Sequence, residues 1–152
     1  MIKIKSSHLE TIKNQGIIHY PEECCGLLIG KSQGKENTVI KIVPTVNDWH
    51  NQKYLFREII HRPDFGTQEN FAIAPQSLLQ IQKKARQQNL DIIGVYHSHP
   101  DHPSIPSEFD RAIAWNGYSY IIVSITKNQV KSLSSWRLNN LNQFLEEKMV
   151  VS

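Results

Sequence analysis

The segment from Gly94 to Trp115, GVYHSHPDHPSIPSEFDRAIAW, contains the residue types from which a metal site is built. His97, His99 and His102 lie within six positions of one another. The first two end an apolar run typical of a β-strand, and side chains two positions apart leave a strand on the same face. Two imidazoles on one face supply two ligands of a zinc site.

A third metal ligand must come from outside this strand, because a catalytic zinc ion takes three protein ligands and leaves a fourth position for water. Asp110 is the candidate, since it lies in the first turn of the next predicted helix. Pro100, Pro103 and Pro106 stiffen the connection, which helps to hold ligands in place before a metal binds. His102 is out of phase with the other histidines, and we expect it to be an exposed residue at the rim.

Ser107 and Asp110 have the Ser-x-x-Asp spacing ahead of an apolar run, which is the signature of a helix N-cap. Taken alone, such a pair is more often a cap than a functional site. The two interpretations are compatible, because a serine at a helix start can direct its hydroxyl and nearby backbone N–H groups toward developing negative charge. The His-x-His pair just before it favours a functional role.

Hydrolysis at a metal site also needs a carboxylate that takes a proton from water and delivers it to the leaving amine. Glu22 and Glu23 lie in PEECCGLLIG, where a predicted helix meets a buried strand, and residue types alone do not choose between them. Cys24 and Cys25 follow at once, so a cysteine hydrolase is an alternative, although it leaves the histidines and Asp110 without a role. Strand alternation points the cysteines to opposite faces, and we expect both in the core.

The elements that must position these residues alternate between strands and helices. Ser7 and Glu10 have capping-box spacing, which predicts a helix from Ser7 to Tyr20, and PQSLLQIQKKARQQNL predicts an amphipathic helix from Pro75. The order predicts a mixed sheet flanked by helices, in the α/β or α+β class. The remaining predicted elements are an edge strand IKIK (2–5), strands CCGLLIGK (24–31), TVIKIVPTV (38–46), FAIAP (71–75), DIIGVYHSH (91–99), YSYIIVSIT (118–126) and VKSLSSWRL (130–138), a helix SEFDRAIAW (107–115), and a strand or helical turn FLEEKMVV (144–151).

Residues 47–70 show no clean periodicity, which predicts a long loop or insertion near the site. Long loops inside compact domains are usually functional or mobile. The aromatic residues Trp49, Tyr54, Phe56 and Phe65 could bind substrate as part of a lid. They could equally pack against their own surface and have no role in catalysis.

The composition is that of an ordinary globular protein. A length of 152 residues predicts one domain over 1–152. The formal net charge of +3 is too small to indicate nucleic acid as a partner. We expect no membrane association and a cytoplasmic location, because there is no long apolar run, no signal-peptide core and no disulfide framework.

The chain resembles the JAMM (MPN+) zinc metalloprotease family, and within it the stand-alone bacterial members. The family signature is a glutamate shortly before a strand, then His-x-His-Pro, and then Ser-x-x-Asp with seven residues between the second histidine and the serine. HSHP (97–100) and SEFD (107–110) match it without substitution. PEECCGLLIG matches the family's Glu-x-x-Gly-Leu-Leu-x-Gly when Gly26 is aligned, which puts the family glutamate at Glu23. The resemblance spans residues 9–136.

The resemblance implies a curved mixed β-sheet flanked by helices, the JAMM/MPN (cytidine deaminase-like) fold. It also implies that His97, His99 and Asp110 bind Zn²⁺, that Glu23 is the general acid/base, and that Ser107 stabilises the oxyanion. The family hydrolyses amide bonds at the C-terminus of ubiquitin or ubiquitin-like proteins. Its stand-alone bacterial members are associated with small sulfur-carrier proteins that end in Gly-Gly.

The partner implied by the resemblance is therefore a ubiquitin-like or sulfur-carrier protein with a Gly-Gly tail. Such a tail is thin enough to thread a groove, and extended tails commonly pair with a free strand edge. A catalytically silent scaffold or binding module of the same fold is the alternative. Silent relatives usually lose a zinc ligand, whereas all are present here, which favours the enzyme. An exposed sheet edge would also permit a homodimer.

Overall fold

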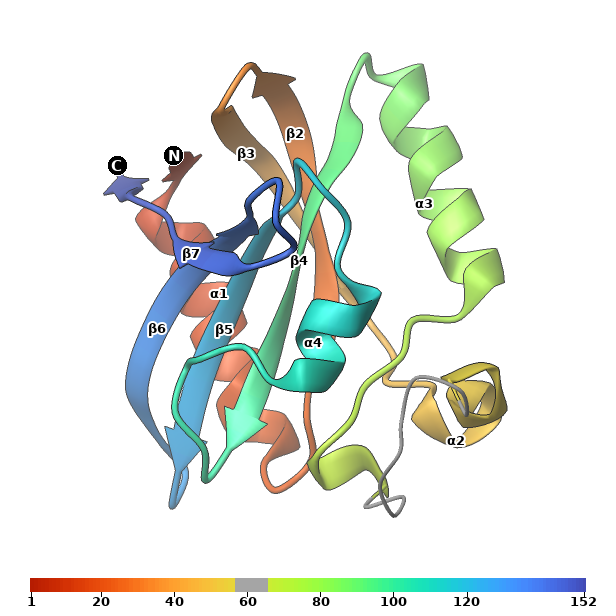
Figure 1. Cartoon of the computed structure of the whole chain (residues 1–152), viewed down its shortest axis with the longest axis vertical. Helices are drawn as coiled ribbons and strands as arrows, with labels where there is room; N and C mark the ends of the chain where they lie inside the picture. Colours follow the sequence, from red (N-terminus) through yellow and green to blue (C-terminus); the bar gives the residue numbers. More distant parts are fainter. Residues whose placement is uncertain (57–65) are drawn as a thin grey trace.

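A computed structural model gives the fold and describes residues 1–56 and 66–152. The strands are β1 (Ile2–Ile4), β2 (Cys25–Gln33), β3 (Glu36–Thr45), β4 (Asp91–Pro100), β5 (Ser119–Thr126), β6 (Gln129–Leu138), β7 (Phe144–Glu146) and β8 (Met149–Val151). They form one sheet in the order β7-β6-β5-β4-β2-β3-β1-β8 (Figure 1). β4 runs parallel to β5, and β1 runs parallel to both β3 and β8, while the other neighbours are antiparallel. The predicted mixed sheet is confirmed.

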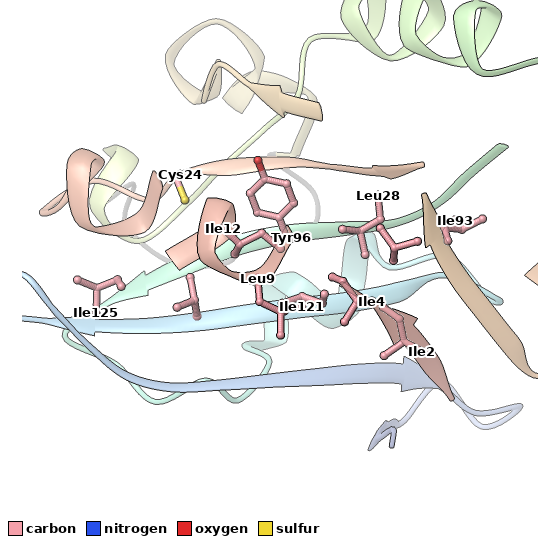
Figure 2. Close-up of a cluster of buried hydrophobic side chains, with 12 residues drawn as sticks. Ile2, Ile4, Leu9, Ile12, Cys24, Leu28, Ile93, Tyr96, Ile121 and Ile125 are labelled. Carbon is pink, nitrogen blue, oxygen red and sulfur yellow. The ribbon is translucent and has the colours of Figure 1, made fainter. Parts of the chain in front are cut away.

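Helices cover both faces of this sheet. They are α1 (Ser6–His19), α2 (Trp49–Gln52), α3 (Pro75–Gln87) and α4 (Glu108–Ile113), with short 3-10 helices η1 (Lys53–Phe56) and η2 (Gly66–Gln68). Leu9 and Ile12 of α1 pack in one apolar cluster (Figure 2). Ala85 of α3 and Phe109 of α4 belong to clusters on the other face.

The apolar run that begins at Cys24 is buried on both sides, which explains why it is nearly continuous in the sequence. Cys24 and Leu28 lie in the same cluster as Leu9 and Ile12 of α1 (Figure 2). Cys25 lies with Phe109 of α4, and Leu27 lies with Ala85 of α3. The alternation separates the two cysteines, as the strand pattern predicts.

The sheet is strongly curled. Only Glu147 and Lys148 separate β7 from β8, yet these two strands stand at opposite ends of the sheet order. The sheet therefore curls around α1, which contacts β3, β4, β5 and β6. The prediction that residues 2–5 form an edge strand is wrong, because β8 pairs with the outer side of β1. Because β8 lies almost the whole chain away in sequence, the residue pattern around β1 cannot indicate this pairing.

Two further local predictions are wrong. The predicted capping box of Ser7 and Glu10 does not form, because α1 begins at Ser6 with Lys5 as N-cap and no side-chain cap. The predicted strand at residues 71–75 is also absent, since 71–74 are irregular and Pro75 starts α3. Its apolar residues are buried in a side-chain cluster instead of a sheet.

The segment 47–70, predicted as a loop, contains α2, η1 and η2 in its described part. The remainder of that prediction, including Phe65, lies outside the described residues. Among residues 1–56 and 66–152, no helix is long and apolar enough to cross a membrane.

Candidate active site

Two histidines at the end of β4 begin the site. His97 and His99 leave the strand on one face, as their spacing predicts, and their Nε2 atoms lie 3.1 Å apart. Phe71 stacks on His97 with ring centroids 4.4 Å apart. The Nδ1 atom of His99 lies 2.8 Å from the carbonyl oxygen of Pro103, so Nδ1 donates to that oxygen.

Asp110 reaches this pair from the first turn of α4. Its Oδ1 lies 3.2 Å from Nε2 of His97, and its Oδ2 lies 3.2 Å from Nε2 of His99. Ser107 is the N-cap of α4 and forms the predicted cap: its hydroxyl accepts from the Asp110 backbone N–H at 3.0 Å, and its own N–H donates to Oδ2 at 2.9 Å. The cap therefore fixes the carboxylate that faces the histidines.

These three side chains fit a tetrahedral zinc ion. Zinc bonds of 2.0–2.1 Å in tetrahedral geometry place neighbouring donor atoms about 3.3 Å apart. The nitrogen–nitrogen and both nitrogen–oxygen separations in the cluster are 3.1–3.2 Å. His97, His99 and Asp110 are all buried, with 1%, 7% and 4% exposed.

The protonation states also suit a cation. Burial lowers the pKa of His97, which favours the neutral imidazole that binds metals. Burial alone would raise the pKa of Asp110, but attraction and hydrogen bonds from the two histidines hold it below its ordinary range. Imidazole nitrogens and an ionised carboxylate form a donor set of the kind that catalytic zinc uses.

Glu23 lies beside this cluster and is 4% exposed. One carboxylate oxygen is 4.0 Å from Nε2 of His99, and ligand atoms of Glu23, His97 and His99 all lie within 4.8 Å of one another. Asp110 is nearer to both histidines than Glu23 is to His99. Asp110 is therefore the carboxylate nearest to both histidines, Glu23 lies adjacent, and Glu22 is exposed.

A cavity of about 390 Å³ opens at the edge of this cluster. Glu23, His99 and Ser107 line it, together with η2 residue Gln68. His102 is on its rim with 60% of its side chain exposed, and it lies 3.9 Å from a carboxylate oxygen of Glu69. His102 is therefore a rim residue, as its spacing predicts.

Residues 5–139 match a family model described as prokaryotic homologs of the JAB domain. The chain belongs to this family. It is 28% identical over 131 residues to a desampylase from Pyrococcus furiosus. The aligned region covers 85% of this chain and 76% of that protein. This JAB-family protein is a hydrolase of the JAMM type.

Solved structures share the fold of this JAB-family hydrolase. A solution structure from Desulfitobacterium hafniense matches with a TM-score of 0.77 and 25% identity, over 100% of this chain and 93% of that one. A structure described as a JAMM metalloprotease-like zinc site in the proteasome and signalosome matches with a TM-score of 0.54 and 18% identity, over 100% of this chain and 98% of that one. The JAMM-type fold expected from the sequence is confirmed.

The aromatic residues of segment 47–70 have different environments in the JAB-family protein. Trp49 is only 1% exposed, stacks on Phe56 at 5.7 Å and meets the edge of Phe109 at 5.5 Å. Tyr54 is 58% exposed. Among the candidates for substrate contact that the structure describes, Tyr54 has the most exposed ring.

Sequence reasoning missed several residues that hold the JAB-family site together. Asn47 donates to the carbonyl oxygen of Glu23, and the Glu23 N–H donates to Thr67. Ser98, between the two histidines, accepts from the Cys24 N–H at 2.8 Å. No local pattern singles out these residues, because each acts on a segment far away in the sequence.

The cysteine-hydrolase alternative conflicts with the state of the thiols. Both cysteines are free and fully buried. Burial is the largest effect on each, and it raises the pKa of Cys24 to about 11 and that of Cys25 to about 12. The nucleophile would have to be a thiolate, which raised pKa values make scarce at neutral pH.

Alkylation with iodoacetamide at pH 8 should therefore leave turnover by the native protein unchanged. At this pH roughly one thousandth or less of either thiol is ionised. Mass spectrometry of labelled native protein should find Cys24 and Cys25 unmodified, whereas denatured protein should react at both. Activity that falls in step with labelling would instead support a cysteine nucleophile.

Proposed function

We propose that the protein is a zinc metallopeptidase. It hydrolyses the bond that follows the C-terminal Gly-Gly tail of a ubiquitin-like or sulfur-carrier protein. The observation that carries this proposal is the buried cluster of donor atoms from His97, His99 and Asp110 with a buried Glu23 carboxylate beside it. A scaffold that only binds a partner protein would not need all four of these side chains.

His97, His99 and Asp110 are the residues that would hold the zinc ion. When bound, zinc supplies a Lewis acid that polarises a carbonyl and lowers the pKa of water toward about 7. Pro103 accepts from His99, and Ser107 donates to Asp110, so two of the ligands are held in orientation by neighbours.

Two other side chains transfer the proton of the attacking water and stabilise the negative charge of the oxyanion. Glu23 takes a proton from the attacking water and delivers it to the leaving amine, for which its position on the cavity wall is suitable. The Ser107 hydroxyl already accepts from the Asp110 N–H, so its own proton remains to be donated to the oxyanion. Both groups line the same cavity.

The substrate class is supported by similarity to a relative named a desampylase, a name that denotes removal of a ubiquitin-like modifier. A Gly-Gly tail has no side chains, so it can approach buried catalytic groups through a narrow opening. We assign contacts with the rest of the partner to the described part of segment 47–70, with exposed Tyr54 as the first candidate and the stacked pair Trp49 and Phe56 as the next. The reduced, unpaired cysteines are consistent with the cytoplasm as its compartment.

The proposal is tested with a small sulfur-carrier protein whose Gly-Gly is followed by a fluorogenic amide, and with the same carrier joined to a lysine side chain. Zinc-loaded protein should release the leaving group after the second glycine, as mass spectrometry would show. A carrier ending in Ala-Ala serves as the matched control and should be cleaved much more slowly. If neither linkage is cleaved, the proposed substrate is wrong; the ratio of the two rates separates peptide from isopeptide specificity.

A further inference from the structure

The side chain of Asn47 joins the segment that carries Glu23 to the segment that follows β3. Its Nδ2 donates to the carbonyl oxygens of Glu23 and Asn70, each at 3.0 Å. Its Oδ1 accepts from the N–H groups of Trp49 and Ala72, each at 3.2 Å. An asparagine amide offers two donors and two acceptor positions, so all four are used here.

Glu23 depends on such contacts because it lies between α1 and β2, outside any helix or strand. Its N–H donates to Thr67 at 2.8 Å, and its carbonyl oxygen accepts from Asn47. The next residue, Cys24, is tied to the histidine strand, since Ser98 Oγ accepts from its N–H and the Ser98 N–H donates to its carbonyl oxygen. Glu23 is therefore held between β4 and the segment that follows β3.

We propose that Asn47 is a positioning residue for Glu23. By fixing the Glu23 carbonyl, its amide sets where the buried carboxylate stands beside His99. Misplacing a reacting group by about 1 Å can lower the rate on the order of 100-fold. The effect on turnover rests on the proposed function, whereas the placement of Glu23 is measurable without any substrate.

Two variants distinguish the loss of the whole Asn47 amide from the loss of its donor group alone. Asn47→Ala removes all four hydrogen bonds. Asn47→Asp keeps the acceptors for Trp49 and Ala72 but removes the donors to Glu23 and Asn70. Both variants should lower kcat on the order of 100-fold, with KM nearly constant and zinc content unchanged. If Asn47 served only to anchor the segment after β3, the aspartate variant would retain wild-type kcat, and the proposal would fail.

Asn37 is the matched control, because its side-chain amide also donates hydrogen bonds to backbone carbonyl oxygens. Its Nδ2 donates to Ile93 at 3.2 Å, to Gly117 at 3.0 Å and to Ser119 Oγ at 2.9 Å, away from the histidine end of β4. Asn37→Ala should lower Tm but leave kcat unchanged. A comparable loss of kcat in this variant would mean that general loosening explains the Asn47 result, and would overturn the proposal.

Hydrogen–deuterium exchange supplies the measurement that needs no substrate. In Asn47→Ala and Asn47→Asp the amides of Glu23 and Cys24 should exchange faster, while the amides of His97 and His99 keep their protection. Unchanged exchange at Glu23 would overturn the proposal. Faster exchange in variants of a protein that cleaves no Gly-Gly substrate would support the placement and count only against the proposed function.

Discussion

Glu23→Gln is expected to lower kcat by roughly 100-fold to 10,000-fold, the contribution typical of a general acid or base. The substitution preserves the shape of the side chain but removes its ability to take a proton. Because an Asp110 oxygen lies 3.2 Å from each histidine nitrogen and Asp110 is the proposed third ligand, bound zinc should stay at about one ion per chain. Steady-state kinetics on the Gly-Gly carrier and elemental analysis of the same sample check both halves of this expectation.

Glu22→Gln is the control for that experiment. Glu22 is the adjacent residue and has the same charge, but it is exposed, whereas Glu23 is 4% exposed. It should leave kcat at the wild-type value. Full activity of Glu23→Gln with loss in Glu22→Gln would move the general base by one residue, and loss of zinc from Glu23→Gln would make Glu23 a ligand.

Removing the metal is expected to abolish turnover without unfolding the protein. Chelation takes away the group that polarises the substrate, but the apolar clusters on both faces of the sheet do not depend on the site. Activity should return on addition of about one equivalent of zinc. Circular dichroism should remain the same throughout. Metal-free protein that turns over at the wild-type rate would contradict the zinc mechanism.

Two variants refine the metal experiment. Asp110→Asn keeps an oxygen that can accept from the Ser107 N–H, so the helix cap persists while the negative charge is lost. Zinc affinity should fall by at least about 100-fold, since even supporting residues of such sites contribute 10–100-fold. His102→Ala should bind zinc normally, because His102 lies on the rim. Equal affinities in both variants would remove Asp110 from the ligand set.

The features that could be predicted from the sequence are those set by near neighbours in the chain. His97 and His99 share a face because strands alternate, and Ser107 caps α4 because the Ser-x-x-Asp spacing spans one helical turn. The failures come from contacts with segments that are distant in the sequence. The Ser7 cap was not formed because the chain enters α1 directly from β1, where the Ser6 N–H bonds to the carbonyl oxygen of Ser152.

By itself, the sequence determined the family, the mixed sheet and the two short motifs that carry the histidines and Asp110. Residue types alone left Glu22 and Glu23 open and the family resemblance favoured Glu23, but only the tertiary structure shows why Glu23 stands beside the histidines. Glu22 and Glu23 differ by one position, but only Glu23 is turned inward, where Asn47 and Thr67 hold its backbone from the segment after β3. The reason is physical: strand alternation and helix capping act over a few residues, whereas burial and hydrogen bonds between distant segments exist only once the sheet has curled.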